Sequence, residues 1–157
     1  MPKKEKPTTS SAPTKPPSWP AFKPPLPVLP LFPEPHPKTN KILTLSTFFP
    51  RSLCRDYVAF LQSLPLITTP GKPKKGDAVR VNDRFQIDDP AFAKRLWDQT
   101  GIQDALAQDD VKDLWGGEPI GLNPNIRVYR YTKGQFFDCH CTQPTFSLFM
   151  LVLTHYR

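Results

Sequence analysis

Proline is distributed very unevenly along this chain of 157 residues, and its distribution limits where regular structure can form. Of the 21 prolines, 13 lie between Pro2 and Pro37. Proline fixes φ and lacks a backbone N–H, so such a segment supplies neither a helix interior nor a central strand. We therefore expect residues 1–40 to be a disordered Pro/Lys-rich tail with polyproline II character, and ordered structure to begin near Lys41.

The tail contains P-x-x-P sequences, such as Pro24 to Pro27, which form the cores of ligands for SH3 and WW domains. It lacks a Lys or Arg at either of the spacings that SH3 ligands normally use. A non-enzymatic interaction protein that uses residues 1–40 as an SH3 or WW ligand is the alternative function. The apolar residues of the tail, among them Trp19 and Phe22, either dock on a neighbouring surface or stay in solvent.

Most of the net charge of +7 lies in the tail. Residues 1–41 contain seven lysines against Glu5 and Glu34, so the rest of the chain is close to balanced at +2. That part has no Lys/Arg stripe interleaved with aromatic residues, and we expect no nucleic-acid partner. The longest apolar run, Leu148 to Leu153, is far shorter than the ~20 residues that span a bilayer, so no membrane partner is expected.

Three cysteines, Cys54, Cys139 and Cys141, are an odd number without the spacing of a disulfide scaffold. This pattern fits reduced thiols inside a cell. The N-terminus has no apolar signal core. We therefore expect a cytoplasmic or nuclear protein.

The first elements predicted after the tail are a strand and a helix. ILTLSTF, residues 42–48, alternates apolar and polar side chains and predicts a strand. RSLCRDYVAFLQSL, residues 51–64, follows Pro50 at a plausible first helical position. Its apolar residues recur at steps of three and four, which gives the predicted helix one apolar face, and Pro65 ends it.

A second strand and a second helix are predicted next. VRVNDRFQI, residues 79–87, reads as a strand. Asp88 or Asp89 then supplies an N-cap for a helix that begins at Pro90 and ends near Gly101.

The last predicted elements are a short helical stretch at 104–115 and a β-hairpin at 125–141. NIRVYRY is rich in β-branched and aromatic residues, TKGQ supplies a turn, and QFFDCHC forms the partner strand. The order strand, helix, strand, helix, hairpin predicts an α+β fold and does not match a βαβ repeat.

The segment NPNIRVYRYTKGQFFDCH, residues 123–140, resembles a strand pair of the 2-oxoglutarate/Fe(II) dioxygenases of the prolyl 4-hydroxylase type. In that family an aromatic-rich strand ends in Arg and Tyr, passes through a turn that contains G-Q, and leads to H-x-D on the next strand. The matching residues in this chain are Arg130, Tyr131, Gly134, Gln135 and His140. The upstream N-x-R of the family is matched by Asn82 and Arg84, and the resemblance covers roughly Leu43 to His140.

The resemblance implies a fold, an activity and site residues. The fold would be the N-terminal helices and first strands of a double-stranded β-helix, or jelly roll, here incomplete. The activity would be hydroxylation of a protein or small-molecule substrate with Fe(II), 2-oxoglutarate and ascorbate. His140 would bind the metal, Tyr131 would hydrogen-bond 2-oxoglutarate, and Asn82 and Arg84 would support the site.

Other interpretations of these residues remain open from the sequence. Tyr129 and Tyr131 also suit ordinary cross-strand contacts with solvated hydroxyls, and Arg84 suits an ion pair at a strand end. Cys139, His140, Cys141 and His155 contain metal-binding residue types, but consecutive strand residues point in alternating directions and zinc sites favour C-x-x-C.

The residues after His140 depart from the family pattern. An Fe(II) that activates O₂ needs two imidazoles and one carboxylate on one face, and His-x-Asp on a strand supplies two of them. Thr142 stands where the family has that Asp, and His155 and Arg157 lie too near for the second His and the basic residue that binds 2-oxoglutarate. We therefore expect a partial oxygenase domain at 41–141, a divergent, truncated end at 142–157, and no catalysis by this chain.

Overall fold

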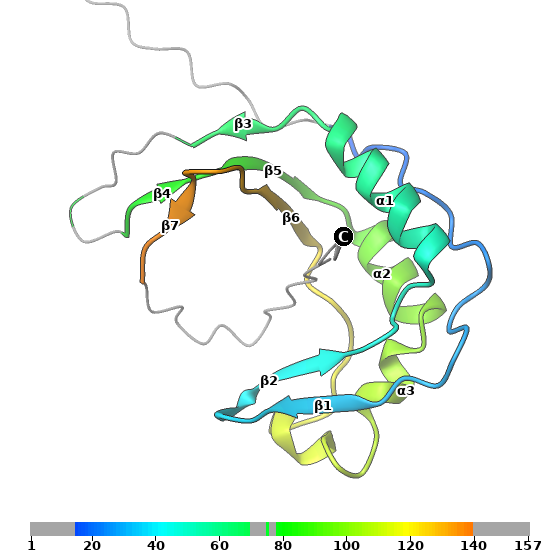
Figure 1. Ribbon diagram of the computed structural model, residues 1–157. Coiled ribbons are helices and arrows are strands. Elements are labelled where there is room, and N and C mark those ends of the chain that lie inside the picture. The colour runs from blue at the N-terminus through cyan, green and yellow to red at the C-terminus, as the bar shows by residue number, and fades with distance from the viewer. Residues whose placement is uncertain (1–14, 70–74, 76–77, 140–157) are drawn as a thin grey trace, which may run out of the picture.

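The structure is a computed structural model that describes residues 15–69, 75 and 78–139. It has a mixed α+β fold in which helices lie along one side and short antiparallel sheets lie beside them (Figure 1). The elements are β1 (Pro33–His36), β2 (Thr39–Leu45), α1 (Arg51–Ser63), β3 (Ile67–Thr68), β4 (Arg80–Val81), β5 (Asp83–Asp88), α2 (Pro90–Gln99), α3 (Ile102–Leu106), the 3-10 helix η1 (Lys112–Trp115), β6 (Asn125–Arg130) and β7 (Phe136–Phe137).

The described strands form three small sheets. β1 pairs with β2, β3, β5 and β6 lie in the order β3-β5-β6, and β4 pairs with β7, all of them antiparallel. In Figure 1 the β1–β2 hairpin lies apart from the three-stranded sheet, near α3, while β5 and β6 extend between the N-terminal end of α2 and the β4–β7 pair. Among the described residues, no helix is long and apolar enough to cross a membrane.

The pairing of β5 with β6 gives the central sheet two different faces. Their register joins Asp83 to Arg130 at one end and Asp88 to Asn125 at the other. Because side chains alternate along a strand, Phe85 and Ile87 share one face with Asp83. Phe85 and Ile87 are buried with Leu64, which follows α1, so this face is the core side of the sheet.

The first two predicted helices are confirmed, although Pro50 is the N-cap of α1 and not its first helical residue. α1 begins directly after Pro50 and buries Leu53 and Tyr57. α2 begins at Pro90, and Asp89 caps it, because its Oδ1 accepts a hydrogen bond of 2.8 Å from the backbone N–H of Phe92. The expected helical stretch at 104–115 is instead divided into α3 and η1.

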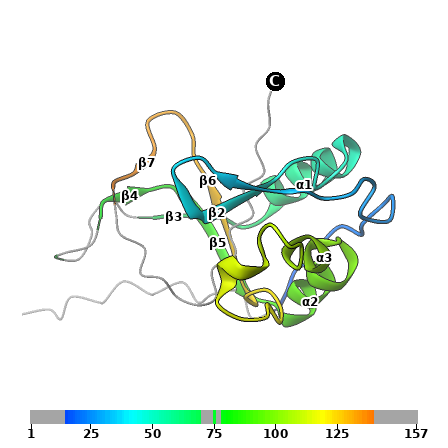
Figure 2. The same cartoon turned by 90° about the horizontal axis from the view of Figure 1, so that it is seen from below.

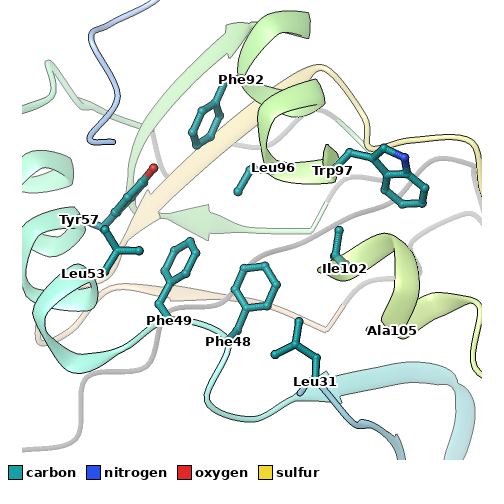
Figure 3. Close-up of a cluster of buried hydrophobic side chains, with 10 residues drawn as sticks. All are labelled: Leu31, Phe48, Phe49, Leu53, Tyr57, Phe92, Leu96, Trp97, Ile102 and Ala105. Atoms are coloured by element: carbon teal, nitrogen blue, oxygen red, sulfur yellow. The ribbon is translucent and has the colours of Figure 1, made fainter. Parts of the chain in front are cut away.

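The main core lies where α1, α2 and α3 meet Leu31, Phe48 and Phe49. Figure 3 shows Phe48 and Phe49 pointing between the helices toward Leu96 and Ile102. The buried members of this cluster are Leu31, Phe48, Phe49, Leu53, Tyr57, Phe92, Leu96, Trp97, Ile102 and Ala105. Burial of each large apolar side chain contributes about 1.5–3 kcal/mol, so this cluster is the main source of stability in the described part of the chain.

From residue 15 onward the Pro-rich segment differs from the expected disordered tail, and residues 1–14 lie outside the described residues. Residues 15–32, here called the strap, run along the helical side of the molecule (Figure 2). The Trp19 ring stacks on Phe92 with 4.1 Å between centroids, and its Nε1 donates a 2.7 Å hydrogen bond to Asp89. Leu31 is buried in the main core.

Two further contacts explain why the strap docks. The Tyr57 hydroxyl donates a 3.0 Å hydrogen bond to the carbonyl of Pro20, and the Arg95 guanidinium lies between the rings of Phe22 and Phe92, 5.3 and 5.2 Å from their centroids. Proline restricts the unfolded chain, so docking this segment costs less conformational entropy than docking a flexible one. The prolines exclude helix and central strand, but some apolar residues between them pack on the core, whereas Val28, Leu29 and Phe32 stay exposed.

The P-x-x-P sequence is part of this docked segment. Leu26 packs against the main core, and Pro27 lies so close to Gly101 that a Cβ there would be 2.8 Å from Pro27 Cγ. Gly101 also has φ of 73°, a conformation that suits glycine at the end of α2. An SH3 or WW domain would therefore have to bind this sequence as docked, or displace Leu26 from the core.

The predicted hairpin of residues 125–141 is wrong in its described part. β7 pairs with β4 and not with β6, with Phe136 opposite Val81 and Phe137 opposite Arg80. β6 pairs with β5 instead. Residues 131–135 form a loop outside the β5–β6 ladder. β7 then continues in the same direction as β6 and pairs with β4, which comes just before β5 in the chain. The G-Q turn therefore does not reverse the chain, and the second edge of β6 has no partner strand among the described residues.

Candidate functional site

The predicted site residues lie around the junction of β4, β5 and β6, except for His140, which is outside the described residues along with Cys141 and His155. Tyr131 directly follows β6 and is 47% exposed. Asn82 lies between β4 and β5 and is fully buried. Arg84 belongs to β5.

Asn82 joins the β4–β5 junction to the segment after β3. Its backbone N–H donates a 3.1 Å hydrogen bond to the Thr69 hydroxyl, which lies 2.9 Å from Asn82 Oδ1. The backbone N–H of Thr69 donates to the Asn82 carbonyl at 2.8 Å. The buried Nδ2 atom of Asn82 has no hydrogen-bond partner in the described part of the chain.

Arg84 contacts an aromatic ring. Its guanidinium carbon lies 6.0 Å from the centroid of Tyr129, the residue opposite it on β6. This cation–π contact is worth about 0.5–1 kcal/mol at a partly exposed site. Arg84 forms no ion pair with a carboxylate of the described residues, which was the alternative interpretation of this residue. Tyr129 is thus a cross-strand contact residue, as one interpretation of the sequence expected.

Asp83, which the sequence interpretation missed, is the centre of the polar contacts here. Its Oδ2 accepts hydrogen bonds from Arg130 Nη2 at 2.8 Å and Arg130 Nε at 3.0 Å. Its Oδ1 accepts from the Thr68 hydroxyl at 2.8 Å and from Gln135 Nε2 at 3.4 Å. We call these four residues the Asp83 cluster; its members come from β3, β5, β6 and the loop after β6.

These donors keep Asp83 ionised. Hydrogen bonds from Thr68 and Arg130 hold its pKa below the ordinary 3.8, Gln135 adds to this, and burial opposes it. The carboxylate is therefore negative at neutral pH. Since donors already occupy both oxygens, Asp83 is a poor general base and a poor metal ligand, and its contacts suit a role in holding other groups in place.

The loop of residues 131–135 is closed by Gln135. Its backbone N–H donates to the Thr132 carbonyl at 2.9 Å, and its side-chain Oε1 accepts from the Thr132 backbone N–H, also at 2.9 Å. Gly134 has φ of 86°, a value that glycine adopts without strain. The same Gln135 side chain therefore closes the loop with its oxygen and joins it to Asp83 with its nitrogen.

A signal in the sequence points to Asp83 in retrospect. Alternation places Asp83 on the same strand face as Phe85 and Ile87, and a carboxylate on a core face requires partners. The same alternation places Arg130 on the face of Ile126 and Val128. An acid and a base on the core faces of two paired strands predict an ion pair, provided that β5 is known to pair with β6.

The described residues contain no group of three or more His, Cys, Asp or Glu side chains that suits a metal ion. Two open hollows, of about 280 and 430 Å³, lie beside α2 and beside residues 112–119, and no member of the Asp83 cluster lines them.

Comparison of the chain with models of protein families, with curated proteins and with solved structures found no match in any of the three.

Proposed function

We propose that this chain carries the front part of a 2-oxoglutarate/Fe(II) dioxygenase domain of the prolyl 4-hydroxylase type. In this proposal Tyr131 contacts the co-substrate, His140 is a metal ligand, and Asn82 and Arg84 support the site. The substrate class stays open between a protein and a small molecule.

The observation that carries the proposal is that the two segments with the family resemblance meet in space. Arg130 and Gln135, from the R-Y-x-x-G-Q segment, both donate hydrogen bonds to Asp83, which lies between Asn82 and Arg84 of the N-x-R segment. The segments are 47 residues apart at Asp83 and Arg130. This contact between two distant segments supports the proposal.

The arrangement of the sheet supports the fold part of the proposal. One face of the β5–β6 pair packs on residues of α1 and its C-terminal end, while the other carries Arg84 and Tyr129. A jelly roll consists of two antiparallel sheets packed face to face, and an antiparallel pair with one covered and one uncovered face is compatible with the first of them. After the loop at 131–135, β7 pairs with β4, the strand that precedes β5.

The donors in these 157 residues do not fit a complete iron site. His140 supplies one imidazole, and Thr142, two positions later, supplies a neutral hydroxyl in place of a carboxylate. Iron affinity in such sites depends on several converging ligands. We therefore propose that the 157-residue chain alone does not turn over 2-oxoglutarate.

Turnover is tested by incubating the purified chain with Fe(II), 2-oxoglutarate and ascorbate, and following succinate by NMR. The wild type and His140→Ala should both remain at the level of the buffer control. Succinate formation that His140→Ala abolishes would contradict the proposed inactivity.

The family assignment has a separate test in the nucleotide sequence that follows the His140 codon, read in all three frames. The expected result is a frame that continues as His-x-Asp, followed tens of codons later by a second His and a nearby Arg or Lys. If no frame contains this continuation, the assignment to the family is wrong.

A further inference from the structure

We propose that Asp83 is a positioning residue that determines where Tyr131 stands relative to the β4–β5 junction. The role of Tyr131 rests on the proposed function. That Asp83 fixes the loop at 131–135 rests on the observed contacts alone.

Both residues next to Tyr131 in the chain are connected to the Asp83 carboxylate by hydrogen bonds. On one side, Arg130 is held to Asp83 Oδ2 through two guanidinium nitrogens at 2.8 and 3.0 Å. On the other side, the Thr132 backbone N–H is held by Gln135 Oε1, and Gln135 Nε2 reaches Asp83 Oδ1 at 3.4 Å. Tyr131 thus lies between two attachments that converge on one residue.

The loop has little else to hold it. Residues 131–134 are exposed, and a Cβ built at Gly134 would meet no other atom within 4 Å. Segments with few buried contacts open locally at low free-energy cost. The position of Tyr131 therefore depends on polar contacts to a fixed point.

Asp83 is such a fixed point because three other contacts hold it in place. It lies on β5, pairs with Arg130 in the β5–β6 ladder, lies opposite Thr68 on β3, and accepts a hydrogen bond from the Thr68 hydroxyl. A charged acceptor gives stronger hydrogen bonds than a neutral one. Its carboxylate therefore holds the loop at 131–135 in a fixed position relative to the sheet.

The test compares two isosteric variants of β5 in the full chain, Asp83→Asn and Asp88→Asn. Asp88 is a matched control, because it lies on the same strand and accepts a 2.7 Å hydrogen bond from Asn125 but does not contact the loop. NMR measures amide exchange at Thr132 and Gln135, exchange at Phe85 and Val128 in the ladder, and the ring resonances of Tyr131.

Asp83→Asn should raise exchange at Thr132 and Gln135 about tenfold and shift the Tyr131 ring resonances, since it removes hydrogen bonds to a charged group. Phe85 and Val128 should keep their protection, and Asp88→Asn should leave the loop and Tyr131 unchanged. The inference is overturned if Asp83→Asn leaves the loop amides and the Tyr131 ring as in the wild type, or if Asp88→Asn moves them equally.

Should Asp83→Asn unfold the sheet, Gln135→Glu gives the second test. It keeps an acceptor for the Thr132 N–H but loses the donor to Asp83 and adds a repelling charge. It should increase exchange at Thr132 at neutral pH, and unchanged exchange would contradict the inference. Neither metal nor 2-oxoglutarate is present, so failure here leaves the family proposal intact, and failure of the family proposal leaves these results unaffected.

Discussion

On the helical side of the molecule, the strap lies against α1 and α2 with stacked rings and buried aliphatic side chains, whereas at the Asp83 end of the sheet a loop is attached through hydrogen bonds to one carboxylate. Apolar burial is non-directional and involves many neighbours at once, so losing part of it weakens the whole fold. Hydrogen bonds are directional and join a few groups, so losing one frees a few residues. The contacts of the strap therefore stabilise the fold, whereas the contacts of Asp83 fix the position of one loop.

The largest effect is expected where the strap meets α2. Phe92→Ala removes a side chain that is 6% exposed and stacked on Trp19, so it should lower the free energy of unfolding by about 3–5 kcal/mol. Urea denaturation followed by circular dichroism measures this. Ile120→Ala, at a side chain that is 93% exposed, is the control and should change stability by less than about 0.5 kcal/mol. Equal effects of the two changes would mean that α2 and the strap do not form the core.

A smaller effect isolates the polar part of strap docking. Trp19→Phe keeps an aromatic ring on Phe92 but removes the indole N–H that donates to the Asp89 carboxylate, a loss of about 1.5–3 kcal/mol. Trp115→Phe loses an indole hydrogen bond of 3.0 Å to the neutral carbonyl of Leu106 and should cost about 0.5–1.5 kcal/mol. Chemical denaturation of both variants ranks them, and the reverse order would argue against a docked strap.

Tyr57 makes the helical side sensitive to alkaline pH. Burial raises its pKa from 10.0 to about 12, although Arg95 opposes this, so the folded state prefers the neutral phenol. Its contribution is complete below pH 10.0 and is lost as pH rises from there toward 12. Tyr57→Phe, which loses the hydrogen bond to Pro20, should cost about 1 kcal/mol at neutral pH and reduce the fall in stability above pH 10.0. A fall as steep as that of the wild type would contradict this.

The smallest effect on global stability is expected at the Asp83 cluster, where the response is to acid. Hydrogen bonds from Thr68 and Arg130 lower the pKa of Asp83 below 3.8, so its contribution is present above pH 3.8 and is lost as pH falls below that value. An NMR pH titration should show the Thr132 amide shifting in this acid range in the wild type and much less in Asp83→Asn. Identical titrations would show that another group controls the loop.

The sequence predicted the elements whose signals are local. The helix after Pro50, the cap at Asp89 and the strand at 125–130 follow from residues within a few positions of each element. The sequence left open whether Trp19 and the other apolar residues of the tail dock, because their partners on α1 and α2 lie more than 30 residues away along the chain.

The candidate site was predicted only in part, because its contacts join distant segments. Tyr131, Asn82 and Arg84 came from a family resemblance; they lie near one junction, and their roles stay predictions. Asp83 and the path of the loop depend on β6 pairing with β5 and β7 with β4, which no local pattern contains.

The difference between the two regions is tested most directly by native-state hydrogen exchange of the wild-type chain at several low urea concentrations. We expect the amides of Phe92 and Ala93 in α2 to exchange only through global unfolding, with a free energy that falls steeply with urea. Thr132 and Gln135 should exchange through a local opening of much lower free energy that barely depends on urea. One common free energy and one common urea dependence for all four amides would contradict this account.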